Sequence, residues 1–418
     1  MKIRSHIPQR VEITVPGSKS YSHRILIASA LSDGVCHIKN CLKSEDTRFT
    51  MRVLKQMGVP LDDSGETIVV HGRAGKFSPC DPPLFVGNSG TSMRLLTAVA
   101  GLGRGTYTLM GTDRMHERPI NDLLDGLTQL GISANSVNAN GCPPVEVQGG
   151  TGAGGTVRLR CGKSSQFLSA ILLIAPYLPQ GAKIHIIEGP VSKPYIDMTL
   201  AVMTQFGVPT DREEYRFYHV PPGKTYRSGT YTVESDASQA GYFWASAAIT
   251  GADIKVKGIN RNSAQGDVRI VSLLESMGCR SIQEADGIRI IGGPLTAIHT
   301  DMADIPDMVP TLAVVAAFAR GTTVISNVAH LKDKESNRLA AVVQELNKMG
   351  VTAACTDDGM TISGGTPHGA AIETYHDHRL AMSFAMAGLV TPGIDIQDPM
   401  CVEKSFPDFW NVFERLYT

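Results

Sequence analysis

Basic side chains beside the starts of apolar runs are the residues of this chain best suited to chemistry with anions. Guanidinium groups bind carboxylate or phosphate through two N–H groups, and the first turn of a helix adds backbone N–H groups that point the same way. These side chains therefore predict a site for a small ligand with several anionic groups. The cations at such positions are Lys19, Arg24, Arg94, Arg118, Lys334, Arg338, Arg379 and Lys404.

Two acids stand among these cations and are candidate proton carriers. Asp307 follows Pro306 ahead of an apolar run over residues 309–319, and Glu335 lies directly after Lys334. Each has a plainer interpretation, because Asp307 could cap a helix and Glu335 could form surface ion pairs. Any single cation of the set could likewise be an ordinary surface residue. The residues alone leave these alternatives open.

The same segments do not favour a metal or a nucleotide. Asp301, Asp304 and Asp307 have a spacing that could hold Mg²⁺, but Pro306 interrupts any helix that would align them. His376 and His378 have no third ligand nearby in the sequence, so helix capping is the better interpretation of their segment. Residues 87–90 lack both the phosphate-loop and the dinucleotide-binding patterns. We expect no metal and no cofactor.

Composition excludes several classes of protein. The chain has 418 residues and a formal net charge of −1, so no overall field attracts nucleic acid or a membrane. Its eight cysteines are scattered, no apolar signal region follows Met1, and no apolar run has the length of a membrane span. These features predict a cytoplasmic protein of two domains. We also expect a monomer whose partners are small molecules, although composition does not specify the oligomeric state.

Repeated helices and strands must position the candidate residues. An apolar residue followed by glycine recurs at intervals of about 71 to 76 residues and closes a helical pattern each time, at Gly58, Gly131, Gly207, Gly278 and Gly350. The order of patterns around each glycine is βαβαββ. Five full copies are visible, and a sixth begins at Asp377 but ends with the chain. We expect Arg10 to Val15 to supply the missing strand of the sixth copy.

Three copies per domain suit the length of the chain. A Pro/Gly/Lys/Ser segment near residues 221–230 marks the weakest boundary. We therefore predict one domain over residues 14–228 and a second over residues 1–13 plus 229–418, joined by a two-strand hinge. If the first helices of the copies pack side by side, their positive N-termini would face one cleft between the domains. The predicted class is α/β, of the mixed α+β kind.

Nine segments of the chain are distinctive in sequence, namely PGSKSYSHR (16–24), GNSGTSMR (87–94), RMHERP (114–119), SSQF (164–167), SKPYID (192–197), IPD (305–307), KESNR (334–338), DHR (377–379) and KSFPDF (404–409). Together they resemble the motifs of the 5-enolpyruvylshikimate-3-phosphate synthase family, a likeness that runs from Pro16 to Phe409. The resemblance implies two domains of three βαβαββ units each, the inside-out α/β barrel of the enolpyruvyl transferase fold.

The resemblance also implies a reaction in the shikimate pathway of aromatic amino acid biosynthesis. The enolpyruvyl group of phosphoenolpyruvate would pass to the 5-hydroxyl of shikimate 3-phosphate, with phosphate leaving a tetrahedral intermediate. Asp307 would take the hydroxyl proton, Glu335 would handle the methylene proton, and Lys19 would serve the departing phosphate.

Ligand-binding residues are implied for both substrates in the same way. Those implied for phosphoenolpyruvate are Lys19, Asn88, Gly90, Arg118, Gln166, Arg338, Arg379 and Lys404. Those implied for shikimate 3-phosphate are Ser20, Arg24, Ser164, Ser165, Gln166, Ser192, Tyr195, Asp307 and Lys334.

Two positions depart from the family pattern, since Leu95 stands where many members have Pro and His330 where some have Asn beside the shikimate ligand. Gly90 is present, so we expect the inhibitor glyphosate to compete with phosphoenolpyruvate.

Two alternatives compete with this interpretation. The sister transferase that acts on UDP-N-acetylglucosamine carries a reactive Cys ahead of an Arg-Pro pair, whereas residues 113–119 contain none. A non-catalytic scaffold of the same repeats would have no need of the acids and bases named above.

Overall fold

Glycine ends five helices of the chain, at the five positions where an apolar residue precedes it. The φ angles of Gly58, Gly131, Gly207, Gly278 and Gly350 lie between +78° and +114°. Glycine adopts this left-handed conformation without the steric penalty of a Cβ, so it favours a helix end there. The five-copy repeat is confirmed. The helices concerned are α2 (Glu45–Gln56), α4 (Asn121–Gln129), α6 (Pro194–Gln205), α8 (Ile270–Ser276) and α10 (Arg338–Lys348).

The computed structural model describes residues 1–418 and forms two units, each with its own hydrophobic core. Unit 1 comprises residues 1–16 and 234–418, and unit 2 comprises residues 17–233. The chain passes from one unit to the other between Pro16 and Gly17 and again between Val233 and Glu234. The predicted hinge at these crossings stays a prediction.

Unit 2 contains three four-stranded sheets, each with one parallel and two antiparallel pairings. Helices from two different copies pack on each other, α3 on α5 and α1 on α6. The sheets are β13 (Gly229–Thr232), β2 (Val35–Lys39), β4 (Ile68–His71) and β3 (Leu61–Asp62); β5 (Leu84–Phe85), β6 (Gly105–Met110), β8 (Val145–Gly149) and β7 (Ala134–Ser136); and β9 (Gly155–Arg160), β10 (Ala182–Glu188), β12 (Phe217–Val220) and β11 (Asp211–Glu213). Its other helices are α1 (Lys19–Leu31), α3 (Gly90–Ala100), α5 (Gln166–Ile174), η1 (Asp113–Glu117) and η2 (Ala175–Tyr177).

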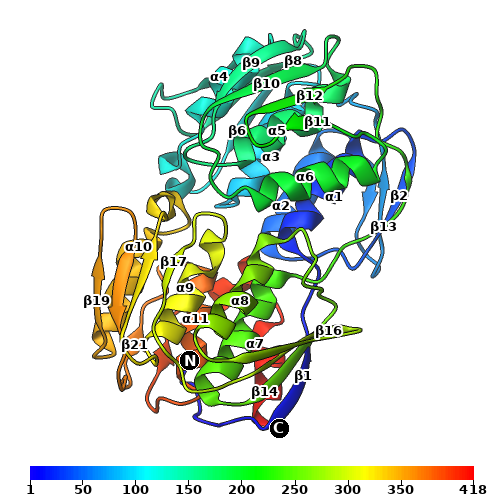
Figure 1. Cartoon of the computed structure of the whole chain (residues 1–418). Helices are drawn as coiled ribbons and strands as arrows, with labels where there is room; N and C mark the ends of the chain where they lie inside the picture. The colour runs from blue at the N-terminus through cyan, green and yellow to red at the C-terminus, as the bar shows by residue number, and fades with distance from the viewer. The chain divides into compact units, whose positions relative to one another are not determined.

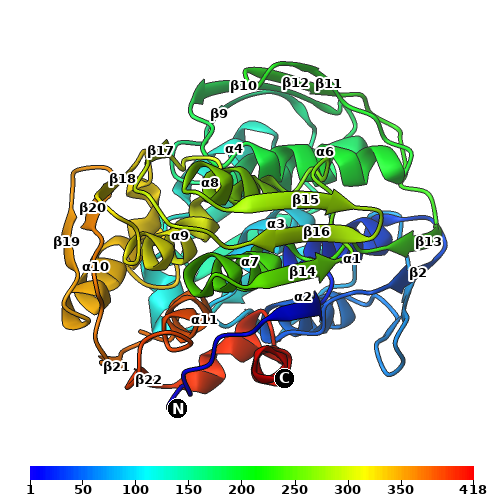
Figure 2. The same cartoon turned by 60° about the horizontal axis from the view of Figure 1, so that its bottom comes forward.

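Unit 1 contains two sheets of the same pattern and a pair of parallel strands. Figure 2 shows β14, β16 and β15 side by side. The sheets are β1 (Arg10–Thr14), β14 (Asp253–Lys257), β16 (Gly287–Ile291) and β15 (Arg280–Glu284); β17 (His299–Asp301), β18 (Thr322–Ser326), β20 (Met360–Ser363) and β19 (Thr352–Cys355); and β21 (Ala371–Ile372) with β22 (Asp395–Ile396).

Three first helices pack on one another in unit 1, namely α7, α9 and α11 (Figure 1). Short 3₁₀ turns precede or follow several of the helices and carry candidate residues. The helical elements are α7 (Ala237–Thr250), α9 (Val309–Ala316), α11 (His378–Ala387), α12 (Phe409–Glu414), η3 (Gly266–Arg269), η4 (Pro306–Met308), η5 (Ala329–Asp333), η6 (Pro399–Lys404) and η7 (Arg415–Tyr417).

The predicted partner of the N-terminal strand was wrong. Strand β1 pairs in parallel with β14 and so completes the fourth copy rather than the sixth. The sixth copy is instead joined by the first residues of the chain, where Lys2 forms a bridge with Asp395 and Ile3 N–H donates to the Ile394 carbonyl. Polar and apolar residues alternate along Arg10–Thr14, which fits any half-buried strand and carries no information about its neighbour.

Small polar side chains cap the helices that begin at the candidate segments. The Ser18, Ser89 and Asp236 side chains accept from the backbone N–H three residues later, at the starts of α1, α3 and α7. Asp377 caps α11 by accepting from the Arg379 N–H, so the capping interpretation of the His376–His378 segment is confirmed. These caps satisfy N–H groups that a first turn leaves unpaired. No helix has the length and apolar character needed to cross a membrane.

Candidate active site

Arg338 organises the charged residues of unit 1. It stands at the start of α10, and its side chain is 1% exposed. Its Nη1 donates to Asp307 at 2.9 Å, its Nη2 to Glu335 at 2.7 Å, and its Nε to Asp377 at 2.7 Å. Burial alone would lower the pKa of Arg338, but these three carboxylates raise it above its ordinary value. The cluster brings Asp307 and Asp377, which lie 31 and 39 positions from Arg338 in the sequence, together with Glu335 of the same segment.

Asp307 lies between two guanidinium groups. Its Oδ1 accepts from Arg338 and its Oδ2 accepts from Arg379 Nη2 at 2.6 Å. Burial raises the pKa of this carboxyl, but the charges of Arg379, Arg338 and Lys334 outweigh burial and hold the pKa well below its ordinary value. Helix α9 begins after Met308 without a side-chain cap, so the interpretation of Asp307 as a helix cap was wrong.

Glu335 is an interior residue of the cluster rather than a surface one. Its side chain is 10% exposed where it accepts from Arg338, three residues further along. The plainer interpretation, a solvent-exposed ion pair, was therefore wrong. Lys334 adjoins it at the end of η5, and its positive charge acts on Asp307.

Arg379 is also held by Tyr242, a residue that the sequence did not single out. Its Nη1 donates to the Tyr242 hydroxyl at 3.2 Å, and Tyr242 is a buried residue of α7. Its backbone N–H donates to Asp377, which also accepts from the Ser336 hydroxyl. The starts of α10 and α11 therefore meet at one buried carboxylate.

Two further residues of unit 1 flank this cluster in sequence. Lys404 is buried at the end of η6. His330 lies in η5, where burial, with a contribution from the charge of Lys334, lowers its pKa to about 3, so the ring is neutral at physiological pH.

Asp301 is one of the three aspartates whose spacing could suggest a Mg²⁺ site. Its side chain accepts from the Asn327 side chain and from the Ala303 N–H.

The first candidate residue of unit 2 along the chain is Lys19, which is also the first residue of α1. The lysine is buried, and its Nζ lies 3.3 Å from Asp46 Oδ2 in the first turn of α2. Asp46, a buried acid, was not predicted from the sequence. This pair joins the starts of two successive helices.

Gly90 lies against two arginines. A Cβ at this position would be 2.6 Å from Arg118 Nη2 and 2.7 Å from Arg94 Nη1, closer than atoms can pack. Arg118 is anchored by Asn88, whose carbonyl and side-chain oxygens accept from its Nη1 at 2.9 and 3.0 Å. The missing side chain at residue 90 lets both guanidinium groups approach the start of α3.

Gln166 connects the starts of α3 and α5. Its Oε1 accepts from Arg94 at 3.0 Å and its Nε2 donates to the Thr91 hydroxyl at 3.0 Å. Its own N–H donates to the Ser164 hydroxyl, while Ser165 occupies the N-cap position of α5. The predicted Ser-Ser-Gln segment therefore lies at a helix start.

Arg24 is buried in α1, 1% exposed, and the structure gives it no carboxylate partner. It donates to the backbone carbonyls of Ser20 at 2.9 Å and Tyr195 at 3.0 Å and to the Thr199 hydroxyl at 2.7 Å. Burial lowers the pKa of this guanidinium to about 10. Ser192, buried with a φ of +54°, lies just before α6, which carries Tyr195.

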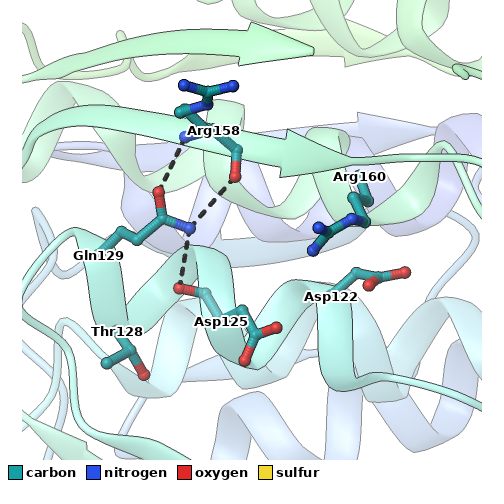
Figure 3. Close-up of a pocket in the computed structure, with 6 residues that line it drawn as sticks. All are labelled: Asp122, Asp125, Thr128, Gln129, Arg158 and Arg160. Carbon is teal, nitrogen blue, oxygen red and sulfur yellow. Dashed lines mark hydrogen bonds between the residues drawn. The ribbon is translucent and has the colours of Figure 1, made fainter. Parts of the chain in front are cut away.

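A surface pocket of unit 2 lies apart from all of these residues. It has a volume of about 330 Å³ and is lined by both acids and arginines of α4 and β9. Figure 3 shows Gln129 bonded to the Arg158 backbone and to the Asp125 carbonyl. Charges of both signs give the pocket no preference for an anion, and no predicted residue lines it.

The predicted residues thus fall into a set in each unit. Those that sequence reasoning missed are partners rather than ligands, namely Asp46, Ser169, Thr199 and Tyr242. The only signal that could have indicated Ser169, Thr199 and Tyr242 is their position within the apolar runs that follow helix starts, and Asp46 lies instead in the acidic first turn of α2.

Comparisons with known proteins agree with one another. A family profile described as EPSP synthase (3-phosphoshikimate 1-carboxyvinyltransferase) matches residues 3–413. A 3-phosphoshikimate 1-carboxyvinyltransferase of Nostoc sp. is 41% identical over 412 residues, covering 98% of this chain and 97% of the relative. One of Methanosphaerula palustris is 43% identical over 413 residues, covering 98% and 97%. The solved EPSP synthase of Acinetobacter baumannii has a TM-score of 0.82 at 29% identity and covers 99% of this chain and 97% of its own.

Proposed function

The chain belongs to the EPSP synthase family, and from that premise we propose that the two sets of residues described above hold the two substrates of enolpyruvyl transfer. The protein is a transferase of the shikimate pathway with the two-domain enolpyruvyl transferase fold. Its reaction moves the enolpyruvyl group of phosphoenolpyruvate to the 5-hydroxyl of shikimate 3-phosphate and releases phosphate.

Phosphoenolpyruvate is assigned to cations and amides of both units. Arg338 and Arg379 suit its carboxylate, because each guanidinium is already held in place by its other bonds. The remaining ligands are Lys19, Asn88, Gly90, Arg118, Gln166 and Lys404. Lys19 also carries a proton to the departing phosphate.

Shikimate 3-phosphate is assigned to the hydroxyl-rich helix starts of unit 2, together with two residues of unit 1, Asp307 and Lys334. Arg24 supports this best, because a buried cation without an acidic partner favours an anionic ligand. The remaining ligands are Ser20, Ser164, Ser165, Gln166, Ser192, Tyr195, Asp307 and Lys334.

The arrangement around Asp307 carries the proposed mechanism. Both of its oxygens accept from guanidinium groups, and a carboxylate held in this way is a weak base. An anionic substrate that takes Arg338 and Arg379 as partners would raise the proton affinity of Asp307. Asp307 then accepts the proton of the 5-hydroxyl as that oxygen attacks the enol carbon. Glu335, bonded to the same Arg338, in its protonated form delivers a proton to the methylene carbon. In the elimination that follows, Glu335 takes a proton back from the new methyl group as the bond to phosphate breaks, and phosphate leaves with a proton from Lys19.

A phosphate-release assay with alternative acceptors tests the reaction. Purified protein is expected to release phosphate from phosphoenolpyruvate when shikimate 3-phosphate is present. Release with UDP-N-acetylglucosamine, or without any acceptor, would contradict it.

Glyphosate is expected to compete with phosphoenolpyruvate, because Gly90 places no methyl group beside Arg94 and Arg118. An inhibition constant far above the KM for phosphoenolpyruvate would contradict this expectation.

We further propose that the protein acts as a cytoplasmic monomer. The cytoplasmic part is supported by the eight cysteines, all of which are free thiols. Light scattering at working concentration and fractionation of cells test the two parts separately.

A further inference from the structure

Four of the five N–H groups of Arg24 have protein acceptors, and all four acceptors are neutral. Nη1 donates to the Ser20 carbonyl, Nη2 to the Tyr195 carbonyl with a longer contact of 3.5 Å to Ser169 Oγ, and Nε to Thr199 Oγ1 at 2.7 Å. A guanidinium has five N–H groups, so one on Nη1 is left for a ligand. The charge is thus oriented by the protein but not cancelled.

Thr199 is the centre of this arrangement. Its Oγ1 lies 2.8 Å from Ser169 Oγ and 2.9 Å from the Tyr195 carbonyl, as well as 2.7 Å from Arg24 Nε. A threonine hydroxyl has a single proton, which goes to Ser169 or Tyr195, so its free lone pair accepts from Arg24. Thr199 belongs to α6 and Ser169 to α5, and both side chains are fully buried. Two helices therefore fix the plane of a guanidinium carried by a third.

Neutral acceptors suit an arginine that must bind an anion. A carboxylate in place of Thr199 would hold the guanidinium equally well but would offset its charge, as Asp377 does for Arg338. A hydroxyl orients the group and leaves its field intact. We propose that Thr199, supported by Ser169, is a positioning residue that fixes Arg24 for an anionic group of the acceptor substrate. The inference rests on the proposed role of Arg24 in binding shikimate 3-phosphate.

Thr199→Val tests the proposal, because valine keeps the shape of threonine and removes only the hydroxyl. The KM for shikimate 3-phosphate is expected to rise about tenfold, while the KM for phosphoenolpyruvate stays within about twofold, because only one ligand uses Arg24. Thr199→Ser restores the hydroxyl and is expected to restore the KM for shikimate 3-phosphate.

Thr97→Val is the matched control. Thr97 is a fully buried threonine of the same unit, in α3, and its hydroxyl donates to the Met93 carbonyl four residues earlier, as that of Thr199 can to Tyr195. It makes no bond to an arginine. The control is expected to leave both KM values unchanged, whereas an equal rise in it would show a general effect of a lost buried hydroxyl and would overturn the proposal.

Arg24→Lys separates the proposed binding role of Arg24 from the proposed positioning role of Thr199. If this variant leaves the KM for shikimate 3-phosphate unchanged, the role proposed for Arg24 fails. If it raises that KM while Thr199→Val does not, only the positioning role fails.

A measurement on the unaltered protein covers the case in which a variant does not fold. The Nε–H of Arg24, identified by the signal that Arg24→Lys or Arg24→Gln removes, is expected to exchange slowly with water in nuclear magnetic resonance spectra. Fast exchange would overturn the bond to Thr199 on which the proposal depends.

Discussion

Arg338 and Arg24 are both large, fully buried side chains at helix-start motifs, yet their surroundings are opposite. Three carboxylates surround Arg338, whereas two carbonyls and two hydroxyls surround Arg24. Carboxylates bind a guanidinium strongly and offset its charge, while neutral acceptors orient it and leave the charge available. The first arrangement couples an arginine proposed to bind an anion to acids that can carry protons, and the second leaves the whole charge of the arginine to an anionic ligand.

Removing the carboxylate shared by the two arginines of unit 1 tests the first half of this comparison and has the largest expected effect. Asp307→Ala is expected to lower kcat by about 10² to 10⁴ while binding of phosphoenolpyruvate is kept, because the change removes the proposed proton carrier. Steady-state rates and calorimetric titration measure the two quantities. Asp301→Ala, which alters an acid bonded to Asn327, is the control that should keep its turnover. Equal loss of binding and turnover would make Asp307 a structural residue.

Replacing each arginine by methionine compares the two surroundings directly. Arg338→Met removes the arginine that Glu335 and Asp377 share and leaves Asp307 bonded to Arg379, so it is expected to lower the free energy of unfolding by about 3–5 kcal/mol. Arg24→Met leaves only neutral acceptors unpaired, so its loss is expected to be about 1–3 kcal/mol. Urea denaturation followed by circular dichroism measures both. Equal losses would show that the kind of acceptor does not matter.

Gly90→Ala tests the residues of unit 2 that are proposed to bind phosphoenolpyruvate. The new methyl group would displace Arg94 and Arg118, so the KM for phosphoenolpyruvate is expected to rise about tenfold, or about 1.4 kcal/mol. Gly126→Ala is the control, because its Cβ would crowd only Ile171 and Leu159 in the core. A rise in KM with both variants would point to a general distortion of unit 2.

The smallest expected effect concerns pH. Glu284 accepts from Arg289 and Lys255 on the sheet of unit 1, and these bonds lower its pKa from 4.5 to about 2. A carboxyl whose folded-state pKa is lowered stabilises the protein above its ordinary pKa and loses that contribution as the pH falls. The difference in Tm between the protein and Glu284→Gln should therefore be largest near pH 7 and disappear near pH 2.

Tryptophan fluorescence can follow this change, since Trp244 and Trp410 both lie in unit 1. Glu66→Gln, an exposed change in unit 2, should give no pH-dependent difference. A constant difference at every pH would contradict the role assigned to Glu284.

Local chemistry made much of this structure predictable. A helix end at Gly58 or Gly350 follows from backbone sterics, and a helix start at Ser89 or Asp377 follows from capping, so both can be read from a few adjacent residues. The regular spacing of these helix ends made the βαβαββ repeat predictable.

Long-range partners could not be predicted in the same way. Nothing in Arg10–Thr14 specifies β14 as its neighbour, and Thr199 looks like any other threonine of a buried helix. The acid–base interpretation of Asp307 depended on its motif, whereas its two bonds to arginines required the folded chain.

The pairing of β1 with β14 has a consequence for synthesis of the chain. Unit 2 is one uninterrupted segment, and its last strand, β13, closes the sheet that β2 began. Unit 2 can therefore fold once Val233 has left the ribosome. Arg10 must wait for Asp253 before its sheet can form, and Met1 must wait for Asp395. Met1 and Arg10, among the first residues to be made, therefore find their partners only after the whole of unit 2 has been synthesised.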